Sequence, residues 1–344
     1  MSRRKLISIV TPCYNEEANI ASCVTAIRSL FSGPLARHDY EHIFCDNAST
    51  DQTLARLREV AAGDPKVKVI VNARNFGPVR SCYNGILAAA GDAAVLFFPA
   101  DLQDPPEVIP RFVELWEQGF QVVRGLRTNR QEGIFLRTLR KIYYRALARL
   151  ADIHLPVDSG EFQLVDRCIL VALRQFDDYY PYIRGMVASC GFTVASVPYR
   201  WERRRRGKSK SNWYVLIDIG LNGLISFSNI PLRLCLLAGF LIAAGSITYG
   251  AVDLVLMLAA MLIYDRQIAA PGIPTLIVAL FFFSGVQLFF LGLLGEYLNA
   301  VHSQVRRRPL VLERERINFP EQPTTAPTNL QLADPSPDRN KPIA

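Results

Sequence analysis

Two oxygen-bearing side chains, Asp101 and Gln103, follow directly after a short apolar run at 94–98. A run of this length, bounded by a glycine and a proline, is typical of a buried strand. Asp101 and Gln103 alternate along the backbone, so both side chains can project to one side. At the carboxyl end of a strand their oxygens can hold a divalent cation together with a diphosphate. The alternative interpretation is a polar turn that the two following prolines end.

The composition narrows the class of protein and its compartment. The chain has 344 residues, an apolar fraction of 50% and a formal net charge of +8. Clustered basic charge suits nucleic acid or an anionic membrane face, and composition does not choose between them. The seven cysteines are scattered and form no Cys-x-x-Cys pair. We therefore expect reduced thiols in a cytosolic compartment rather than disulfides or a zinc site.

The first two hundred residues alternate apolar runs with helical patterns. Strands are predicted at 6–10, 42–45, 67–71, 94–98 and 122–126. Apolar residues at helical spacing stand between these runs, as they do from Ile20 to Phe31. Strands that alternate with helices are typical of an α/β fold with a mostly parallel sheet covered on both faces. This domain is expected to span residues 1–210.

The chain changes character near residue 200. Residues 200–210 are strongly basic, and 211–230 carry apolar residues at the spacing of an amphipathic helix. We expect that helix to lie on a membrane surface, with the basic run against anionic lipid head groups. A helix that faces an ordinary protein core is the alternative.

Two long apolar stretches follow, at 234–263 and 274–294. Each is long enough to cross about 30 Å of hydrocarbon. We therefore expect a two-helix transmembrane hairpin over 231–300. Basic residues flank both ends of the hairpin, which places the α/β domain and the tail 301–344 in the cytoplasm. The tail is basic at first and then rich in polar residues and proline, which predicts disorder.

Several motifs, in one order along the chain, indicate a known family. They stand at 8–17, 46–51, 74–77, 91–92, 100–107, 160–167 and 207–210. Over about residues 5–312 the chain resembles the family 2 glycosyltransferases, in the polyprenyl-phosphate group that includes dolichol-phosphate mannose synthase. The resemblance implies a GT-A (Rossmann-like) fold, a nucleotide-sugar donor, a divalent metal (Mg²⁺ or Mn²⁺) and a polyprenyl-phosphate acceptor.

The motifs and their chemistry assign candidate roles. Asp101 and Gln103 are the candidate metal ligands, and the predicted catalytic residues are Asp101, Glu161 and Arg127. The candidate acceptor-phosphate residues are Arg127, Arg204 and Lys210, although many basic residues in such runs are simply solvated. Asp104 is expected to cap the helix that begins at the two prolines. The candidate nucleotide-sugar residues are Pro12, Asn15, Glu16, Asp46, Asn75 and Asp101; Asn15 could equally be a helix cap.

Three residues depart from the family pattern. Pro99 stands where many members have a carboxylate, which leaves the metal one protein ligand fewer. Glu161 stands where Asp is usual, so the charge is kept but moved by one methylene. Gln163 stands where Arg is usual, so a cation near the expected acceptor site is missing.

The function predicted from these motifs is inverting transfer of a sugar to a polyprenyl phosphate, giving a lipid-linked donor for cell-envelope glycosylation. The protein is then expected to be an integral protein of the cytoplasmic (inner) membrane, in contact with membrane lipids. Candidate protein partners are a second copy of the chain, a multispan flippase and a downstream glycosyltransferase; no nucleic acid is expected. The alternatives are an inactive membrane scaffold and a polysaccharide synthase, whose Gln-x-x-Arg-Trp motif has Val197 in place of Gln.

Overall fold

The computed structural model describes residues 3–128, 159–201, 230–264, 273–306 and 308–320. The chain forms two compact units. The first comprises residues 1–148, 153–211 and 308–344 and holds a single sheet, and the second comprises 149–152 and 212–307 and holds two long helices. The predicted interfacial helix at 211–230, together with Arg204 and Lys210, lies outside the described residues except for its last residue.

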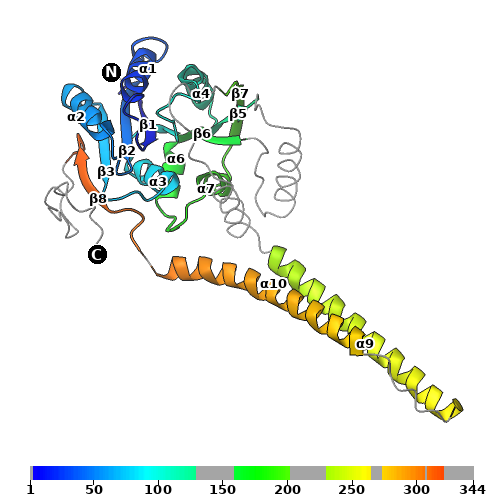
Figure 1. Cartoon of the computed structure of the whole chain (residues 1–344). Helices are drawn as coiled ribbons and strands as arrows, with labels where there is room; N and C mark the ends of the chain where they lie inside the picture. The colour runs from blue at the N-terminus through cyan, green and yellow to red at the C-terminus, as the bar shows by residue number, and fades with distance from the viewer. Residues whose placement is uncertain (1–2, 129–158, 202–229, 265–272, 307, 321–344) are drawn as a thin grey trace, which may run out of the picture. The chain divides into compact units, whose positions relative to one another are not determined.

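The sheet of the first unit has the strand order β7-β5-β6-β4-β1-β2-β3-β8 (Figure 1). Strand β1 lies between β4 and β2, and the neighbours from β4 to β3 are all parallel. The strands, in chain order, are β1 (Leu6–Cys13), β2 (Asp39–Asp46), β3 (Val67–Asn72), β4 (Ala93–Leu96), β5 (Val122–Arg127), β6 (Ser159–Asp166), β7 (Val194–Tyr199) and β8 (Glu313–Ile317).

The five strands predicted from apolar runs are present as β1 to β5. The prediction for β4 is two residues too long, because Phe97 has a φ of 55° and leaves the extended conformation. The sheet is mixed: four of its seven pairs of neighbouring strands are parallel and three are antiparallel, so it contains more antiparallel pairing than the prediction of a mostly parallel sheet implies. The physical reason is an unpredicted strand, β6, which runs back between β4 and β5 and is antiparallel to both.

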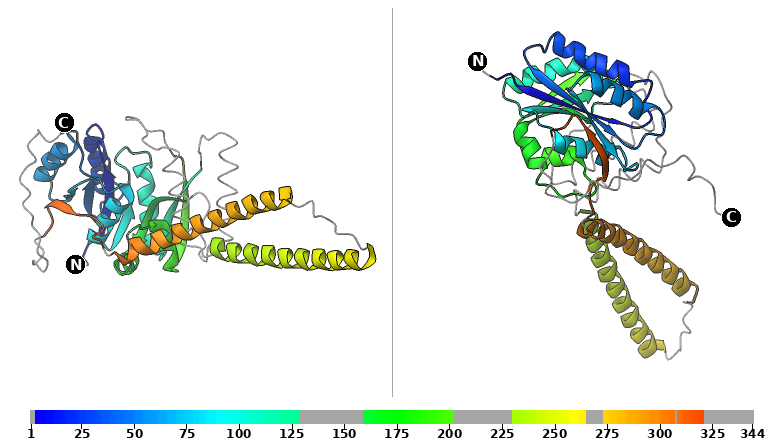
Figure 2. Two further views of the ribbon diagram at one scale, coloured as in Figure 1. Left: turned by 60° about the horizontal axis from the view of Figure 1, so that its bottom comes forward. Right: turned by 90° about the vertical axis from the view of Figure 1, so that its left-hand side faces the viewer.

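Helices cover both faces of the sheet, as predicted (Figure 2). Ile9 and Phe44 belong to one core cluster, whereas Val10 and Ile43 belong to the other, because successive side chains of a strand point to opposite faces. The first face is covered by α1 (Ile20–Ser32), α2 (Thr53–Gly63) and α4 (Ile109–Glu117), and the second by α3 (Pro78–Ala88), α6 (Arg167–Leu173) and α7 (Ile183–Ser189).

Helix α3 lies unusually close to the sheet, and Gly85 makes this possible. A Cβ atom at Gly85 would lie 2.3 Å from Cys45 Sγ and 2.9 Å from Val10 Cγ1. Any larger side chain would push the helix off the strands. The close approach sets the position of the loop that leads from β3 into α3.

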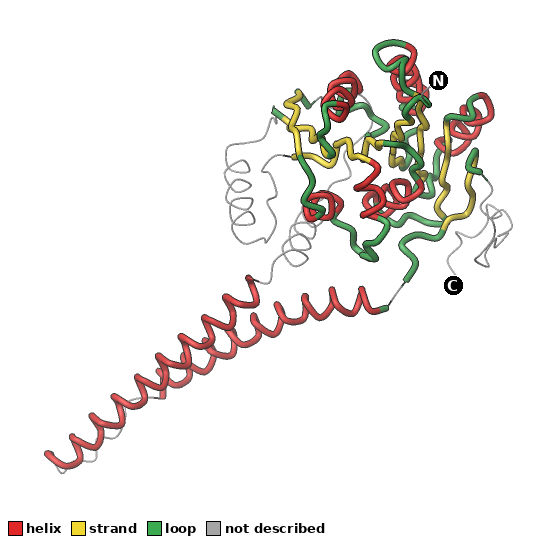
Figure 3. The backbone as a smooth tube through the Cα atoms, turned by 180° about the vertical axis from the view of Figure 1, so that it is seen from behind, coloured by secondary structure: helices red, strands yellow, loops and turns green. Residues whose placement is uncertain are grey.

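The described residues of the second unit form α9 (Ile230–Tyr264) and α10 (Ile273–Val305), which pack against each other (Figure 3). Within the described residues, no helix combines the length and the apolar character that a membrane crossing requires. The prediction of a transmembrane hairpin over 231–300 is therefore wrong. The two apolar stretches correctly predicted the positions of α9 and α10. The number of consecutive apolar residues did not, however, predict whether these helices can cross a membrane.

A strand that the sequence did not indicate, β8, closes the β3 edge of the sheet. It follows α10 in the chain and is antiparallel to β3, and Ala73 donates its N–H to the Leu312 carbonyl at 2.8 Å. Asn318 Nδ2 then donates to the carbonyls of Ala61 and Val67, at 2.7 and 2.8 Å. Along β8 the side chains alternate between negative and positive charge. Such charges suit an edge strand, because they oppose pairing with strands of other molecules.

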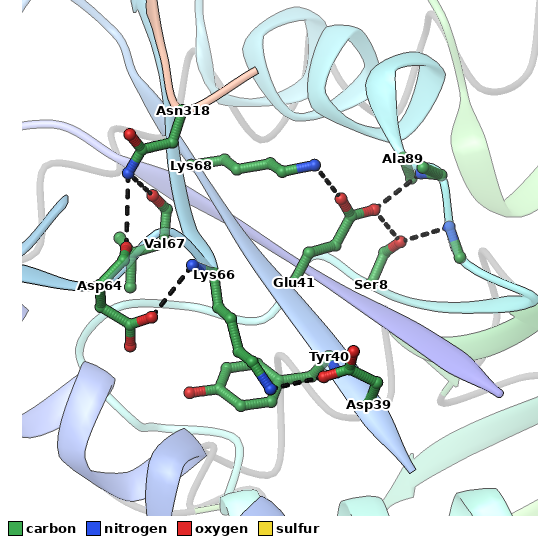
Figure 4. Close-up of polar contacts among 12 residues, drawn as sticks. Ser8, Asp39, Tyr40, Glu41, Asp64, Lys66, Val67, Lys68, Ala89 and Asn318 are labelled. Atoms are coloured by element: carbon green, nitrogen blue, oxygen red, sulfur yellow. Dashed lines mark hydrogen bonds and ion pairs between the residues drawn. The ribbon is translucent and has the colours of Figure 1, made fainter. Parts of the chain in front are cut away.

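A buried carboxylate, Glu41, ties the strands together at the amino end of the parallel sheet (Figure 4). The Glu41 side chain accepts from Ser8 Oγ at 2.5 Å, from Lys68 Nζ at 2.6 Å and from the N–H of Ala90 at 2.7 Å. Ser8 Oγ accepts in turn from the N–H of Gly91 at 2.9 Å. Three strands and the turn before β4 thus share one satisfied ionic network.

We expect Glu41→Gln to lower the free energy of unfolding by about 2 kcal/mol, because the partly buried Lys68 then loses its counter-charge. Chemical denaturation of the full chain measures the change. The matched control is Asp39→Asn, which breaks the exposed pair with Lys66 and should cost less than about 0.5 kcal/mol. Equal effects of the two substitutions would show that the Glu41 network adds no special stability.

A second buried group, His42 on β2, makes stability depend on pH. Its side chain is 1% exposed, its Nε2 lies 2.9 Å from Thr11 Oγ1, and burial lowers its pKa to about 3. In the unfolded chain the pKa is about 6.5. The folded state therefore keeps His42 neutral, and its contribution to stability is fully present above about pH 6.5 and is lost as the pH falls.

We expect the free energy of unfolding to fall between pH 7 and pH 5 by about 2 kcal/mol more in the natural chain than in His42→Gln. Urea titrations of both proteins at several pH values measure this difference, and the other titrating groups cancel in it. Parallel stability curves for the two proteins would contradict the assignment of a neutral buried histidine.

Candidate active site

The sheet brings several predicted site residues to one edge. Strands β1, β2, β3, β4 and β5 all end there, and the antiparallel β6 begins there. A cleft of about 530 Å³ is formed by the segments that follow β1, β2, β3 and β4. Its walls include Pro12, Asn15, Glu16, Asn47, Asn75, Pro99 and Asp101. Of the predicted nucleotide-sugar residues, only Asp46 is not part of its wall.

Asn15 joins the loops that follow β1 and β2. Its Nδ2 donates to Thr50 Oγ1 at 3.1 Å, and its Oδ1 accepts from the N–H of Thr50 at 2.8 Å. Its φ of 56° is tolerated better by Asn than by most residues. Helix α1 begins at Ile20, so Asn15 is not the cap of that helix. The neighbouring Glu16 is held in the same way, since its N–H donates to Thr53 Oγ1 at 2.8 Å.

Asn47, which the sequence analysis missed, organises the next wall of the cleft. Its Nδ2 donates to Asn75 Oδ1 at 2.9 Å, and its Oδ1 accepts from the N–H of Phe76 at 2.9 Å and from Asn72 Nδ2 at 3.1 Å. The N–H of Gly77, whose φ is 87°, donates to Asn75 Oδ1 at 2.9 Å. This amide network fixes Asn75 in the wall. The signal in the sequence was the recurrence of Asn after successive strands.

Asp46, the last residue of β2, is fully buried. Its carboxylate accepts from Ser49 Oγ at 2.5 Å and from the N–H of Ser49 at 3.3 Å. Burial raises the pKa of Asp46, while the bonds from Ser49 act to lower it. The side chain shapes the turn that presents Asn47 to the cleft.

The loop after β4 carries Asp101 and is conformationally strained. Phe97 and Leu102 have φ values of 55° and 56°, which cost about 1–3 kcal/mol each for residues other than glycine. Asp101 lies in the cleft wall, and its Oδ1 accepts from the N–H of Gln103 at 3.3 Å. The loop is anchored where the N–H of Phe98 donates to the Val10 carbonyl at 2.9 Å. Such strain is stored where a site needs a fixed geometry.

Asp104 forms the strongest polar contact of this loop, and the prediction that it caps a helix is wrong. Arg127 donates to it through Nε at 3.2 Å and Nη2 at 2.9 Å, and the Tyr199 hydroxyl also donates to it. The turn of 3₁₀ helix that follows, Pro106–Val108, has no side-chain cap. The Asp104 carboxylate is held by a bidentate, charge-assisted pair with a guanidinium rather than by the backbone N–H groups of that turn. Arg127 therefore fastens the Asp101 loop to the ends of β5 and β7.

Glu161 lies near the start of β6, within the electrostatic influence of two guanidiniums. Burial raises the pKa of the Glu161 carboxyl, whereas the charges of Arg184 and Arg127 act in the opposite direction. Arg184 belongs to α7 and was not anticipated from the sequence. The preceding Gly160 leaves room for Arg127, because a Cβ there would lie 3.3 Å from its Nε.

The residues present fit a divalent cation whose ligands come partly from the protein and partly from a substrate. No cluster of three or more His, Cys, Asp or Glu that could hold a metal occurs in the described ranges. Asp101 and Gln103 supply hard oxygen donors on one loop. Mg²⁺ is commonly bound by one or two carboxylates together with substrate phosphates. This donor set suits that mode of binding rather than a closed protein cage.

Known proteins place the chain in a family. Residues 8–173 match the model of glycosyl transferase family 2. An uncharacterised glycosyltransferase of Bacillus subtilis is 34% identical over 313 residues, which cover 91% of this chain and 94% of that protein. The chain belongs to glycosyl transferase family 2. The resemblance found in the motifs is thus confirmed, and the protein is a glycosyltransferase.

Two further proteins are similar to this family 2 chain. A prophage-derived bactoprenol glucosyl transferase of Shigella flexneri is 31% identical over 304 residues, covering 88% of this chain and 96% of that protein. Among solved structures, a mannosyltransferase of Pyrobaculum calidifontis in complex with GDP-Man and Mn²⁺ has a TM-score of 0.45 and 17% identity, and the match covers 89% of this chain and 87% of that one.

We expect Asp101→Asn to lower turnover at saturating nucleotide sugar about 100-fold, the usual scale for a lost electrostatic contact at a developing charge. Transfer rates and calorimetric binding of Mn²⁺ in the presence of a nucleoside diphosphate measure the effect. Glu107→Gln is the matched control, because Glu107 is an exposed carboxylate six residues further on. Normal turnover in Asp101→Asn would remove Asp101 from the active site.

Proposed function

We propose that this glycosyltransferase transfers a sugar, with inversion, from a nucleotide-diphosphate sugar to a polyprenyl phosphate. The observation that carries the proposal is the cleft in which Asn15, Asn75 and Asp101 meet, beside the cationic end of β5. A polar wall suits a nucleoside, and cations beside it suit a second phosphate. The name of the Shigella relative, a bactoprenol glucosyl transferase, supports a lipid phosphate acceptor.

The donor is assigned to the cleft, whose wall includes Pro12, Asn15, Glu16, Asn75 and Asp101. Asp46 contributes indirectly, because its hydrogen bond with Ser49 holds the turn that carries Asn47. Asp101 and Gln103 are the ligands for Mg²⁺ or Mn²⁺. The bound cation offsets the negative charge of the donor diphosphate.

The acceptor supplies its own nucleophile. A phosphate oxygen, largely ionised near neutral pH, forms a bond to the anomeric carbon, and the bond from that carbon to the nucleoside diphosphate breaks. A strong general base is not needed. Glu161 orients the acceptor, and Arg127 holds the Asp101 loop while its charge offsets that of the reacting phosphates. Arg204 and Lys210 complete the acceptor-phosphate site in this proposal.

A polyprenyl acceptor places the reaction at the cytoplasmic face of a membrane. The product is a lipid-linked sugar that serves as a donor for cell-envelope glycosylation. An inactive scaffold of the same fold is the rival that Pro99 favours, because this residue stands in the cleft wall in place of a carboxylate.

The test is transfer to lipid. The full chain is incubated with Mg²⁺ or Mn²⁺, polyprenyl phosphate and each of a panel of radiolabelled nucleotide sugars. We expect one donor to label the organic phase, and we expect chelation of the metal or Asp101→Asn to abolish that label. Absence of organic-phase label with every donor would contradict the proposal. Label in a polymer that stays at the chromatographic origin would indicate a polysaccharide synthase.

A further inference from the structure

Two buried polar residues face each other across neighbouring strands close to the Asp101 loop. Arg124 of β5 is the direct partner of Gln163 of β6, and Gln163 is also the partner of Leu96, the last residue of β4. Arg124 is 7% exposed and Gln163 is 1% exposed. Directly opposed side chains of antiparallel strands stand on the same face, with Cβ atoms about 4.5–5.5 Å apart.

Neither residue is satisfied within the part of the chain that the structure describes. Gln163 Nε2 is buried and has no hydrogen-bond partner. Arg124 has no carboxylate partner among the described residues. A buried donor without an acceptor is costly, and a buried charge without a counter-charge is more so. Gln163 therefore needs a hydrogen-bond acceptor and Arg124 a negative charge, and one anionic acceptor can serve both.

The surrounding charges add to this need. Burial lowers the pKa of Arg124, and the positive charge of Arg184 on α7 lowers it further. The carboxylate that feels Arg184 is Glu161, two residues before Gln163. Arg127 forms an ion pair with Asp104, a kind of partner that Arg124 lacks within the described residues. Arg124 thus lies within the electrostatic influence of a second guanidinium, and its own positive charge has no ion-pair partner among the described residues.

We propose that Arg124 binds the phosphate of the lipid acceptor, in place of the cation that the family pattern carries at position 163, and that the Gln163 amide donates to the same phosphate. The inference rests on the proposed function and names further residues of its acceptor site. The Arg124 guanidinium on β5 faces position 163 of β6, so it can reach the space that a cation at position 163 would occupy. The bidentate donor pattern of Arg suits a phosphate with two or more free oxygens.

The first test compares the natural chain with Arg124→Gln. We expect the apparent Michaelis constant for polyprenyl phosphate to rise about 10- to 100-fold, the range for a lost charged hydrogen-bonding group. The constant for the nucleotide sugar should change less than about twofold. The matched control is Arg167→Gln, which removes the same charge from an exposed side chain that binds the carbonyl of Ala90 before β4.

The second test exchanges the two residues. The double variant Arg124→Gln/Gln163→Arg returns the cation to the usual position, so we expect it to recover acceptor binding to within about threefold of the natural chain. A purely structural role of Arg124 would lower stability in Arg124→Gln without a selective effect on the acceptor, and the exchange would not rescue it. Either result would overturn the proposal.

A binding measurement tests the phosphate site independently of the proposed reaction. Farnesyl phosphate is titrated calorimetrically into the full chain with a nucleoside diphosphate and Mn²⁺. If the natural chain labels no lipid but binds farnesyl phosphate, and Arg124→Gln weakens that binding at least tenfold, the proposed reaction fails and the phosphate site stands. If the natural chain does not bind farnesyl phosphate, or binds it as tightly as Arg124→Gln does, the phosphate site is wrong.

Discussion

The buried ion pair between Asp104 and Arg127 is the interaction on which the geometry of the site depends. The carboxylate is almost fully buried, so its charge is tolerable only because both oxygens are held by Arg127 and one also by Tyr199. Asp104 lies three residues after Asp101, on a loop with two strained backbone conformations. The pair therefore holds the loop in a conformation that it would not otherwise prefer.

On the other side of the cleft, neutral hydrogen bonds perform the same task. Asn15 links the loops after β1 and β2, and Asn47 links those after β2 and β3. These bonds impose geometry without adding charge. The cleft is thus lined by amides and carboxylates, and Arg127 lies beyond its acidic loop. In a reaction between a nucleotide sugar and a phosphate, the first property suits the nucleoside and the second suits the phosphates.

The opposite end of the parallel sheet is organised for stability. Glu41 satisfies donors from β1, β3 and the turn before β4, and His42 is kept neutral by burial. Parallel strands make this separation possible, because their amino ends gather at one edge and their carboxyl ends at the other. Changes at one edge can then alter stability while the loops that form the cleft keep their own hydrogen bonds.

The sequence alone was sufficient for the strands β1 to β5, the helices on both faces, the positions of the two long helices and the acidic motif at Asp101. Each has a local pattern, either of apolar periodicity or of neighbouring residue types. Only the tertiary structure revealed that β8 is a strand, because its charged side chains show no apolar pattern and its hydrogen bonds come from β3. Asp104 was misread for the same reason, since its partners Arg127 and Tyr199 lie 23 and 95 residues further along the chain. Likewise, the facing of Arg124 and Gln163 follows from strand register, which no stretch of local sequence encodes.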